Sequence, residues 1–274
     1  MTGMMRKWSQ AAQALAAGSV ALTSLATSAA AAPAQPVGQW TVELQGERCL
    51  AGLDFTVFGR PVKFVLEPNP TGGGGYLYVI NQGHLDGYGW VYADIAIGAD
   101  LAKHQVVEMM PSPESNRNIY RWPIGEEWLA KLDVAQRLWV QSEPLHADLA
   151  VTGLAQARAE LRMCDSRLLA GWGFAADQQA RLATFPQMDT LDIQPSDVPK
   201  DVYRHGAVGN VDGRVTVAAN GKASNCRVIE SSGWPTLDAK ACELMVSRGI
   251  FKPAKAKDGS AMGAPYFFQF QFPS

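Results

Sequence analysis

The dipeptide Asn220-Gly221 is the feature that most constrains how this 274-residue chain can fold. Asn-Gly between alternating apolar and polar residues is the strongest short-range hairpin signal, because both residues tolerate a positive φ. Residues 213–217 alternate before it, and residues 222–231 place Cys226 and Val228 on one face after it. The sequence therefore predicts a β-hairpin with one buried face.

A helix is predicted directly after this hairpin. Thr236 is the expected N-cap, and Asp238 adds a favourable negative charge to the first turn. A basic residue and a glycine, Arg248 and Gly249, end the helical pattern. The apolar stripe of this helix consists of Leu237, Ala241, Leu244 and Met245.

Alternating phenylalanines predict a third strand at the end of the chain. They follow a turn at Asp258-Gly259 and are separated by the glutamines Gln269 and Gln271. The order of elements is therefore strand, strand, helix, strand, with a buried aromatic face on the last strand. The phenylalanines are Phe268, Phe270 and Phe272.

Residues 195–272 resemble the TonB C-terminal domain. The resemblance is carried by the hairpin sequence VTVAANGKASNCRVIESSG, the Leu237-Asp238 pair, the Phe251-Lys252-Pro253 segment and the closing aromatic strand. A cysteine in the second strand and another in the helix resemble a subset of periplasmic TonB-family proteins. In this family the last strand offers an edge to an extended peptide. The resemblance thus implies a partner-binding edge strand made of Pro265, Tyr266, Phe267, Phe268, Gln269, Phe270 and Gln271.

Four cysteines allow three disulfide pairings. The resemblance implies that Cys226 pairs with Cys242, and the predicted geometry supports this because the helix must pack on the strand face that carries Cys226. Cys49 is then left to pair with Cys164. Closing the loop of about 16 residues between Cys226 and Cys242 stabilises a small domain by roughly 3 kcal/mol.

Residues 1–32 predict a secretory signal peptide. Arg6 and Lys7 form a basic start, an uncharged segment rich in Ala, Leu and Val follows, and Ala-x-Ala cleavage options lie between Ala29 and Ala34. We expect cleavage and export to the periplasm. Anchoring in the inner membrane by an uncleaved leader is the alternative, because TonB itself keeps its N-terminal helix. Beyond residue 32, no apolar run approaches the roughly eighteen residues that span a bilayer.

The two expected disulfides divide the exported chain into two units. Residues 37–174 predict an N-terminal α+β domain of unknown function, antiparallel and β-rich, with a long C-terminal helix. Residues 175–200 predict a linker, and residues 201–274 a small TonB C-terminal-like ββαβ domain. The predicted fold class is therefore α+β. In the first unit the expected strands lie near 39–45, 62–66, 76–80 and 138–140, and the expected helix near 149–170.

Two features separate the chain from a TonB-type energy transducer. The linker contains only Pro186, Pro195 and Pro199, without Pro-Glu or Pro-Lys repeats, and a stretch of about 25 residues spans at most roughly 85 Å. The first histidine, His84, lies outside the leader. The shared domain is therefore expected to serve for binding. A membrane-anchored energy transducer is kept as an alternative.

No set of residues predicts catalysis, a metal site or a cofactor. His104 and Glu108 have the i,i+4 spacing of a helix but no third ligand in sequence. The four glycines from Gly72 to Gly75 lack the Lys-Ser/Thr of a phosphate loop, and Ser231-Ser232-Gly233 is a turn rather than a nucleophile elbow. The formal net charge of −2 argues against nucleic acid as a partner. The histidines are scattered over His84, His104, His146 and His205.

The expected function is non-enzymatic binding of an envelope protein or peptide by β-strand addition, with an outer-membrane transporter as one option. In the alternative arrangement, the first domain or a second copy of the chain covers the edge strand, the latter in a homodimer. A hypothesis of another class is a small-ligand binder or enzyme that uses the tryptophan-rich first unit, which would require a pocket with convergent polar groups. The tryptophans of this unit are Trp40, Trp90, Trp122, Trp128, Trp139 and Trp172.

Overall fold

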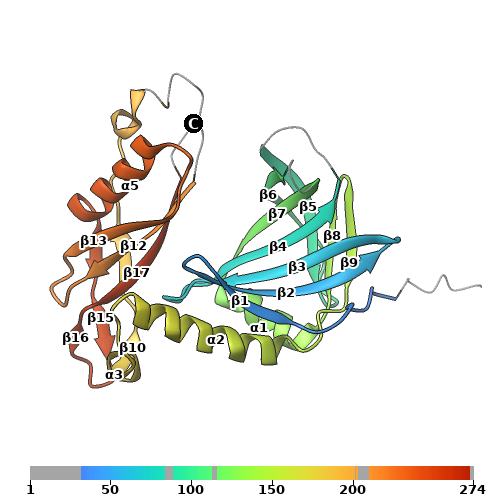
Figure 1. Ribbon diagram of the computed structural model, residues 1–274, viewed down its shortest axis with the longest axis horizontal. Helices are drawn as coiled ribbons and strands as arrows, with labels where there is room; N and C mark the ends of the chain where they lie inside the picture. Colours follow the sequence, from blue (N-terminus) through green and yellow to red (C-terminus); the bar gives the residue numbers. More distant parts are fainter. Residues whose placement is uncertain (1–31, 84–88, 113–115, 201, 203–209, 272–274) are drawn as a thin grey trace, which may run out of the picture. The chain divides into compact units, whose positions relative to one another are not determined.

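The computed structural model describes residues 32–83, 89–112, 116–200, 202 and 210–271 (Figure 1). The predicted signal peptide, except for Ala32, lies outside the described residues, as do His84, His205 and Phe272. All elements discussed below belong to the unit that spans residues 33–274. The strands pair antiparallel throughout the described part, and a few helices accompany them, so the fold class is α+β.

A nine-stranded sheet occupies the first part of this unit. Its strands are β1 (Thr41–Gln45), β2 (Arg48–Val57), β3 (Arg60–Pro68), β4 (Gly75–Gln82), β5 (Gly89–Ile97), β6 (Lys103–Ser112), β7 (Arg117–Ile124), β8 (Leu138–Ser142) and β9 (Leu145–Leu149). Their order in the sheet is β1-β2-β3-β4-β7-β6-β5-β8-β9 (Figure 1). Ala34 forms a bridge with Leu149 and Pro36 a bridge with Phe55. The residues before β1 therefore connect β9 with β2, and the sheet curls on itself.

The alternation of side chains along these strands builds a core inside the curled sheet. In β2, Leu53 and Phe55 are at most 2% exposed, whereas the alternating residues Asp54 and Thr56 face solvent. Trp122 of β7 is also almost completely buried. Apolar side chains from all strands except β1 thus fill the interior of the sheet.

Two helices pack on this sheet, α1 (Glu126–Ala135) and α2 (Leu154–Gly171). Cys164 in α2 is bonded to Cys49 in β2, with an S–S distance of 2.04 Å, which is the pairing expected from the sequence. The helix starts later than predicted, because Leu149 ends β9 and is buried there. Gly153, with a φ of 74°, makes the turn into α2.

A second sheet with the order β13-β12-β17 carries the elements predicted around Asn220-Gly221. It consists of β12 (Asn210–Val217), β13 (Ala223–Glu230) and β17 (Ala264–Gln271), and the helix α5 (Pro235–Ser247) lies between β13 and β17 in the chain (Figure 1). The whole predicted stripe of α5 is buried, with Leu237 and Leu244 at 0% exposure. Cys226 in β13 is bonded to Cys242 in α5, again as expected.

The start of α5 differs from the prediction. The helix begins at Pro235 with Trp234 in the N-cap position, so Thr236 is not the N-cap. Proline suits the first helical position because a backbone N–H there would have no acceptor within the helix. The predicted charge in the first turn, Asp238, accepts hydrogen bonds from the hydroxyls of Ser231 and Ser232. The turn before the helix is therefore tied to its first turn.

Short elements occupy the stretch 175–200, for which the sequence suggests a linker. They are α3 (Ala176–Arg181), β10 (Leu182–Thr184), β11 (Gln187–Thr190) and the 3-10 helix η2 (Pro195–Asp197). β10 pairs with β15 (Ala254–Ala256), which also pairs with β16 (Ala261–Met262), and β11 pairs with β14 (Ile250–Lys252). Backbone pairing thus holds this stretch to the residues that follow α5.

Candidate functional site

The strand β17 lies at the end of its sheet. It pairs with β12 along its whole length, from Ala264 opposite Val217 to Gln271 opposite Asn210. On its other side, no strand pairs with it within the described ranges. All residues expected to form the edge strand, 265–271, belong to β17.

Alternate residues of β17 direct their backbone groups away from β12, as in any antiparallel pair. Phe267 is one of them, because its N–H donates a hydrogen bond to Thr71 Oγ1 at 3.1 Å. Pro265, two residues earlier and opposite Thr216, has the same orientation as Phe267. A proline is tolerated there because the pairing with β12 does not require its N–H. Gln269, two residues later, therefore also presents its N–H and C=O on the outer side of the sheet.

The side chains of β17 fall on two faces. Phe268 and Phe270 are each 3% exposed and belong to the core that includes α5, which is the buried aromatic face predicted from the sequence. Phe267 faces the other way and is 7% exposed. Both faces of the strand are thus anchored by aromatic rings, which fixes the position of its outer backbone groups.

A cleft of about 410 Å³ borders the outer side of β17. Tyr266, Gln269 and their neighbours from β17 form one wall. Apolar residues from other elements, Met188, Leu191 and Met245, also line it. The remaining lining residues are Glu67, Pro68, Asn69, Gly73, Gly75, Tyr76, Pro123, Ile124 and Gly125. The outer backbone groups of β17 therefore face an open space with mixed apolar and polar walls.

The loop between β3 and β4 supplies the group that contacts β17. Asn69 organises this loop: its Oδ1 accepts hydrogen bonds from the N–H and the hydroxyl of Thr71, at 2.8 and 2.9 Å. The N–H of Asn69 donates to the carbonyl of Gly74 at 2.8 Å. Thr71 is 6% exposed, and its hydroxyl is thereby positioned to accept from Phe267.

One glycine of this loop has a clear steric role. Gly74 has a φ of 110°, and a Cβ there would lie 2.0 Å from the carbonyl oxygen of Ile124. A side chain at this position is therefore excluded by both the backbone conformation and the close approach of β7. The glycine run, interpreted from the sequence as a turn, shapes the loop that carries Thr71.

A buried polar cluster lies beside the outer face of β12. Asp212 is 2% exposed and stands opposite Gln269 in the β12–β17 pair. Burial, and then the charge of Glu230, raise the pKa of Asp212 to about 7. Nearby, Glu108 of β6 forms a buried ion pair with Arg121 of β7. Charged residues of the first sheet thus surround the side chains of β12.

Direct contacts join this cluster to the hairpin β12–β13. Asn210 Nδ2 donates to Glu108 Oε1 at 2.7 Å. Glu47, in the turn between β1 and β2, lies 3.3 Å from Arg214 Nε and 2.7 Å from Arg227 Nε. The guanidinium of Arg214 also stacks over the ring of Trp172, at 5.1 Å from its centroid. These contacts join the hairpin β12–β13, on the face opposite to α5, to Glu108, Glu47 and Trp172.

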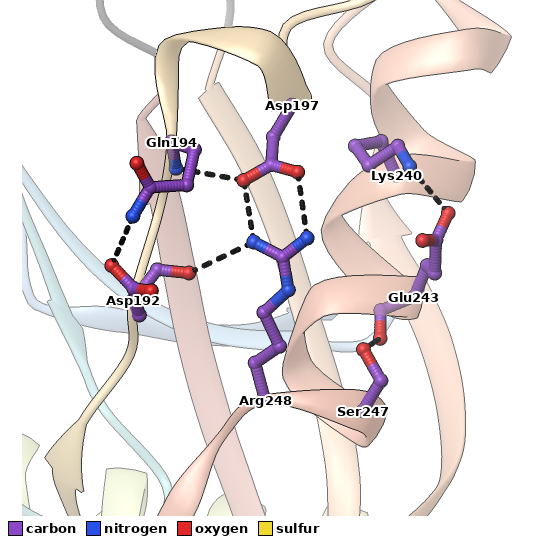
Figure 2. A network of polar contacts seen from close by, with 7 residues as sticks. All are labelled: Asp192, Gln194, Asp197, Lys240, Glu243, Ser247 and Arg248. Carbon is purple, nitrogen blue, oxygen red and sulfur yellow. Dashed lines mark hydrogen bonds and ion pairs between the residues drawn. The ribbon is translucent and has the colours of Figure 1, made fainter.

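Figure 2 shows how the segment before β12 is held to the end of α5. Arg248, the C-cap residue of α5, donates to both carboxylate oxygens of Asp197, at 2.7 and 3.0 Å. Its Nη1 also lies 3.4 Å from the carbonyl oxygen of Asp192. The N–H of Gln194 donates to Asp197 Oδ2 at 2.7 Å. This bond, and then Arg248, hold the pKa of Asp197 below its usual value.

Figure 2 also shows Gln194 Nε2 donating to Asp192 Oδ1 at 2.7 Å, and two further contacts on the exposed side of α5. Lys240 Nζ and Glu243 Oε2 are 2.6 Å apart, and the Ser247 hydroxyl donates to the carbonyl of Glu243 at 2.7 Å. Exposed pairs of this kind contribute little to stability. The bidentate contact between Asp197 and Arg248 is therefore the main attachment in this network.

The candidate chemical residues do not come together. His104 and Glu108 lie in the strand β6, so the helical spacing considered from the sequence is wrong. His104 stacks on Tyr92 and its Nδ1 lies 2.7 Å from Asp94 Oδ1. Across the ranges described, no group of three or more His, Cys, Asp or Glu side chains is arranged to hold a metal ion.

The tryptophans of the first unit are mostly packed against its core. Trp122 is buried, and Trp40, Trp128 and Trp172 pack against the same cluster. Trp40 meets Phe64 edge to face at 5.7 Å. Trp90 is the exception at 51% exposure. The interior of the sheet is thus occupied by side chains.

The fold around β17 defines a small disulfide-linked domain in which two strands, a helix and a final edge strand follow one another. Residues 197–272 match the family described as Gram-negative bacterial TonB protein C-terminal. Residues 197–272 of this chain are therefore a TonB C-terminal domain. No curated protein matches the chain. This family is a protein-interaction domain. It indicates a protein of the Gram-negative cell envelope that is linked to transport and has another envelope protein as its partner. No helix in the described part of the chain has the length and apolar character needed to cross a membrane.

Sequence reasoning missed the other walls of the cleft. For the loop that contains Thr71 the sequence predicts only a turn, and Met188 and Leu191 lie in the stretch interpreted as a linker. A buried threonine between a proline and four glycines has no sequence signature that points to β17. These residues are recognised only once the chain is folded.

Proposed function

We propose that the outer side of β17 binds an extended segment of an envelope protein by β-strand addition. The single observation that carries the proposal is that outward-facing backbone groups of β17 border a cleft instead of another strand. Backbone hydrogen bonds would supply affinity, and the walls of the cleft would select side chains. An outer-membrane transporter is one candidate partner.

The chemistry of the cleft suits a short, mainly apolar peptide. Met188 and Met245 are unbranched and adaptable, and they form part of its wall. A cleft of about 410 Å³ accommodates only a few residues, so the paired segment is short. The proposed role is non-enzymatic and requires no cofactor or metal.

The hydrogen bond between Thr71 and Phe267 is relevant to the alternative in which the first domain covers the edge strand β17. It occupies the N–H of Phe267, whereas Gln269 lines the cleft. We propose that the first unit covers one position of the edge, and that the partner pairs beyond it or displaces Thr71. A second copy of the chain, giving a homodimer, would use the same backbone groups.

The test is a proline at Gln269. A proline there removes an outward N–H without touching the ladder to β12, so it should abolish binding of a peptide selected from a random library on the unaltered protein. Gln269→Ala is the matched control, since it removes the side chain and keeps the N–H. Phe267→Pro is a harsher variant, because it also removes a buried ring and the bond to Thr71.

Two results would oppose the proposal: equal peptide affinity of Gln269→Pro and the unaltered protein, or equal loss in Gln269→Ala and Gln269→Pro. Analytical sedimentation of the protein without peptide determines whether it is a monomer or a homodimer. If Gln269→Pro converts a dimer into a monomer, the edge serves self-association.

The domain boundaries and the periplasmic location are parts of the same proposal. We propose a cleaved leader over residues 1–32, a first domain over 37–174, a linker over 175–200 and the TonB C-terminal domain over 201–274. Sequencing the N-terminus of the envelope-derived protein tests the leader. A chain that starts at Met1 and sediments with the inner membrane would favour a membrane-anchored energy transducer instead.

A further inference from the structure

A second cavity, of about 450 Å³, lies between α2 and the loop that follows β3. It shares only Pro68 and Asn69 with the cleft beside β17. Its volume falls in the range of small-molecule sites, roughly 300–1,000 Å³. Most of its wall is apolar and consists of Leu66, Leu129, Leu161, Leu169, Leu182 and Phe185.

Asp165 is an unusual wall residue of this cavity. It follows Cys164 in α2, so the disulfide to Cys49 fixes the backbone next to it. Its Oδ1 is closed off from solvent and has no hydrogen-bond partner within the described part of the chain. A buried acceptor without a partner is destabilising, because its desolvation is not compensated by a hydrogen bond. Burial, and then the negative charge of Glu67, raise the pKa of this carboxyl group to about 7.

The basic residues near Asp165 do not neutralise it in this arrangement. Arg158 lines the cavity but is paired with Asp133. Arg162 and Glu126 are exposed residues of opposite charge at the rim. Asp165 therefore adds a carboxylate without an ion-pair partner among the described residues to the wall of the cavity. The complementary group is a cation that can donate hydrogen bonds.

We propose that this cavity binds an apolar primary amine, whose ammonium group pairs with the carboxylate of Asp165 while its hydrocarbon part contacts the leucines and Phe185. A charge-assisted bond of this kind is roughly twice as strong as a neutral one. It gives the Asp165 carboxylate a partner of opposite charge and offsets its desolvation. A carboxylate ligand would instead be repelled by the carboxylate of Asp165.

The test uses three probes that share a six-carbon chain. Hexylammonium, hexanol and hexanoate are titrated calorimetrically into the purified, disulfide-bonded protein at about pH 7.5. Hexylammonium should bind at a single site, at least about tenfold more tightly than hexanol, and hexanoate should not bind. The absence of saturable binding of hexylammonium, or equal binding of hexanol or hexanoate, would overturn the proposal.

Two variants locate the site. Asp165→Asn keeps the shape and removes the charge, and should weaken hexylammonium binding about tenfold. Arg162→Gln at the exposed rim is the control and should change the affinity by less than about threefold, as for an exposed charge. Unchanged affinity in Asp165→Asn would contradict the assignment.

A measurement on the unaltered protein covers the case in which Asp165→Asn does not fold. At about pH 6 the carboxyl group is protonated before binding and must ionise to pair with the ammonium. Calorimetry in two buffers of different ionisation enthalpy should then detect release of close to one proton per bound amine. Binding without proton release would refute the role of Asp165.

Discussion

The hydroxyl of Thr71 accepts a hydrogen bond from the backbone N–H of Phe267, at 3.1 Å and across 196 residues of sequence. The donor belongs to the edge strand of the TonB C-terminal domain, and the acceptor belongs to a loop of the nine-stranded sheet. The contact occupies a backbone group that strand addition would otherwise use. The loop of Thr71 thus acts on the same edge as the proposed partner.

Replacing Thr71 by valine should expose this competition. Thr71→Val removes the acceptor and leaves the N–H of Phe267 without its partner, so hydrogen exchange at Phe267 should become faster. If a partner peptide pairs at this position, its affinity should rise several-fold, since Thr71 no longer has to be displaced. Thr71→Ser keeps the hydroxyl and is the matched control. Equal exchange rates in the two variants would show that the bond is not formed in solution.

The elements of the C-terminal domain could be predicted because their signals are local. Asn220-Gly221 specifies a turn, and the apolar stripe of α5 follows the helical period over a few residues. The predicted N-cap of α5, Thr236, lies two positions after the observed one, Trp234, because both Pro235 and Thr236 are favourable at a helix start and only the fold decides between them. Pairing of Cys226 with Cys242 was implied by the resemblance to the TonB C-terminal domain and supported by the expected packing of the helix on the strand.

The first unit was harder to predict. Leu154 and Leu161 continue an apolar repeat that already includes Leu149, so the sequence suggested one long helix. The structure ends a strand at Leu149 and turns at Gly153, because Leu149 is needed in the core of the sheet. The cleft could not be predicted at all, since its walls come from segments far apart in sequence that only the tertiary fold brings together.

Removing the guanidinium of Arg248 should release the segment before β12 from α5. In Arg248→Ala the N–H of Gln194 should exchange several-fold faster, because Asp197 loses the partner that positions it. The pKa of Asp197 is held below its ordinary value of 3.8, so the contact stabilises the protein above that pH and is lost as the pH falls below it. Lys240→Ala, which removes an exposed pair on the same helix, should leave this exchange unchanged. A slower or identical rate in Arg248→Ala would contradict the attachment.

The two disulfides should contribute unequally. Cys226 and Cys242 are 16 residues apart, for which loop closure predicts roughly 3 kcal/mol, whereas Cys49 and Cys164 are 115 apart and should contribute closer to about 5 kcal/mol. Paired alanine substitutions at each bridge, compared by urea unfolding, measure the two losses. A larger loss at the Cys226–Cys242 pair would mean that loop length does not control their contributions. Loss of peptide binding is expected mainly for that pair, because it lies in the domain of β17.

Asp212 should make stability depend on pH around neutrality. Its pKa is raised from an ordinary 3.8 to about 7, so the folded protein holds a proton that the unfolded chain releases. This contribution to stability is fully present below pH 3.8 and is lost as the pH rises to about 7. Asp212→Asn should remove this dependence and be more stable than the unaltered protein at about pH 8, by up to about 4 kcal/mol. Urea unfolding at intervals from about pH 5 to 8 measures the free energy of unfolding of Asp212→Asn and of the unaltered protein. Asp165→Asn, which removes a different buried carboxyl group, is measured for comparison. If Asp212→Asn keeps the pH slope of the unaltered protein, the pKa of Asp212 is not raised in the fold and another group causes the slope.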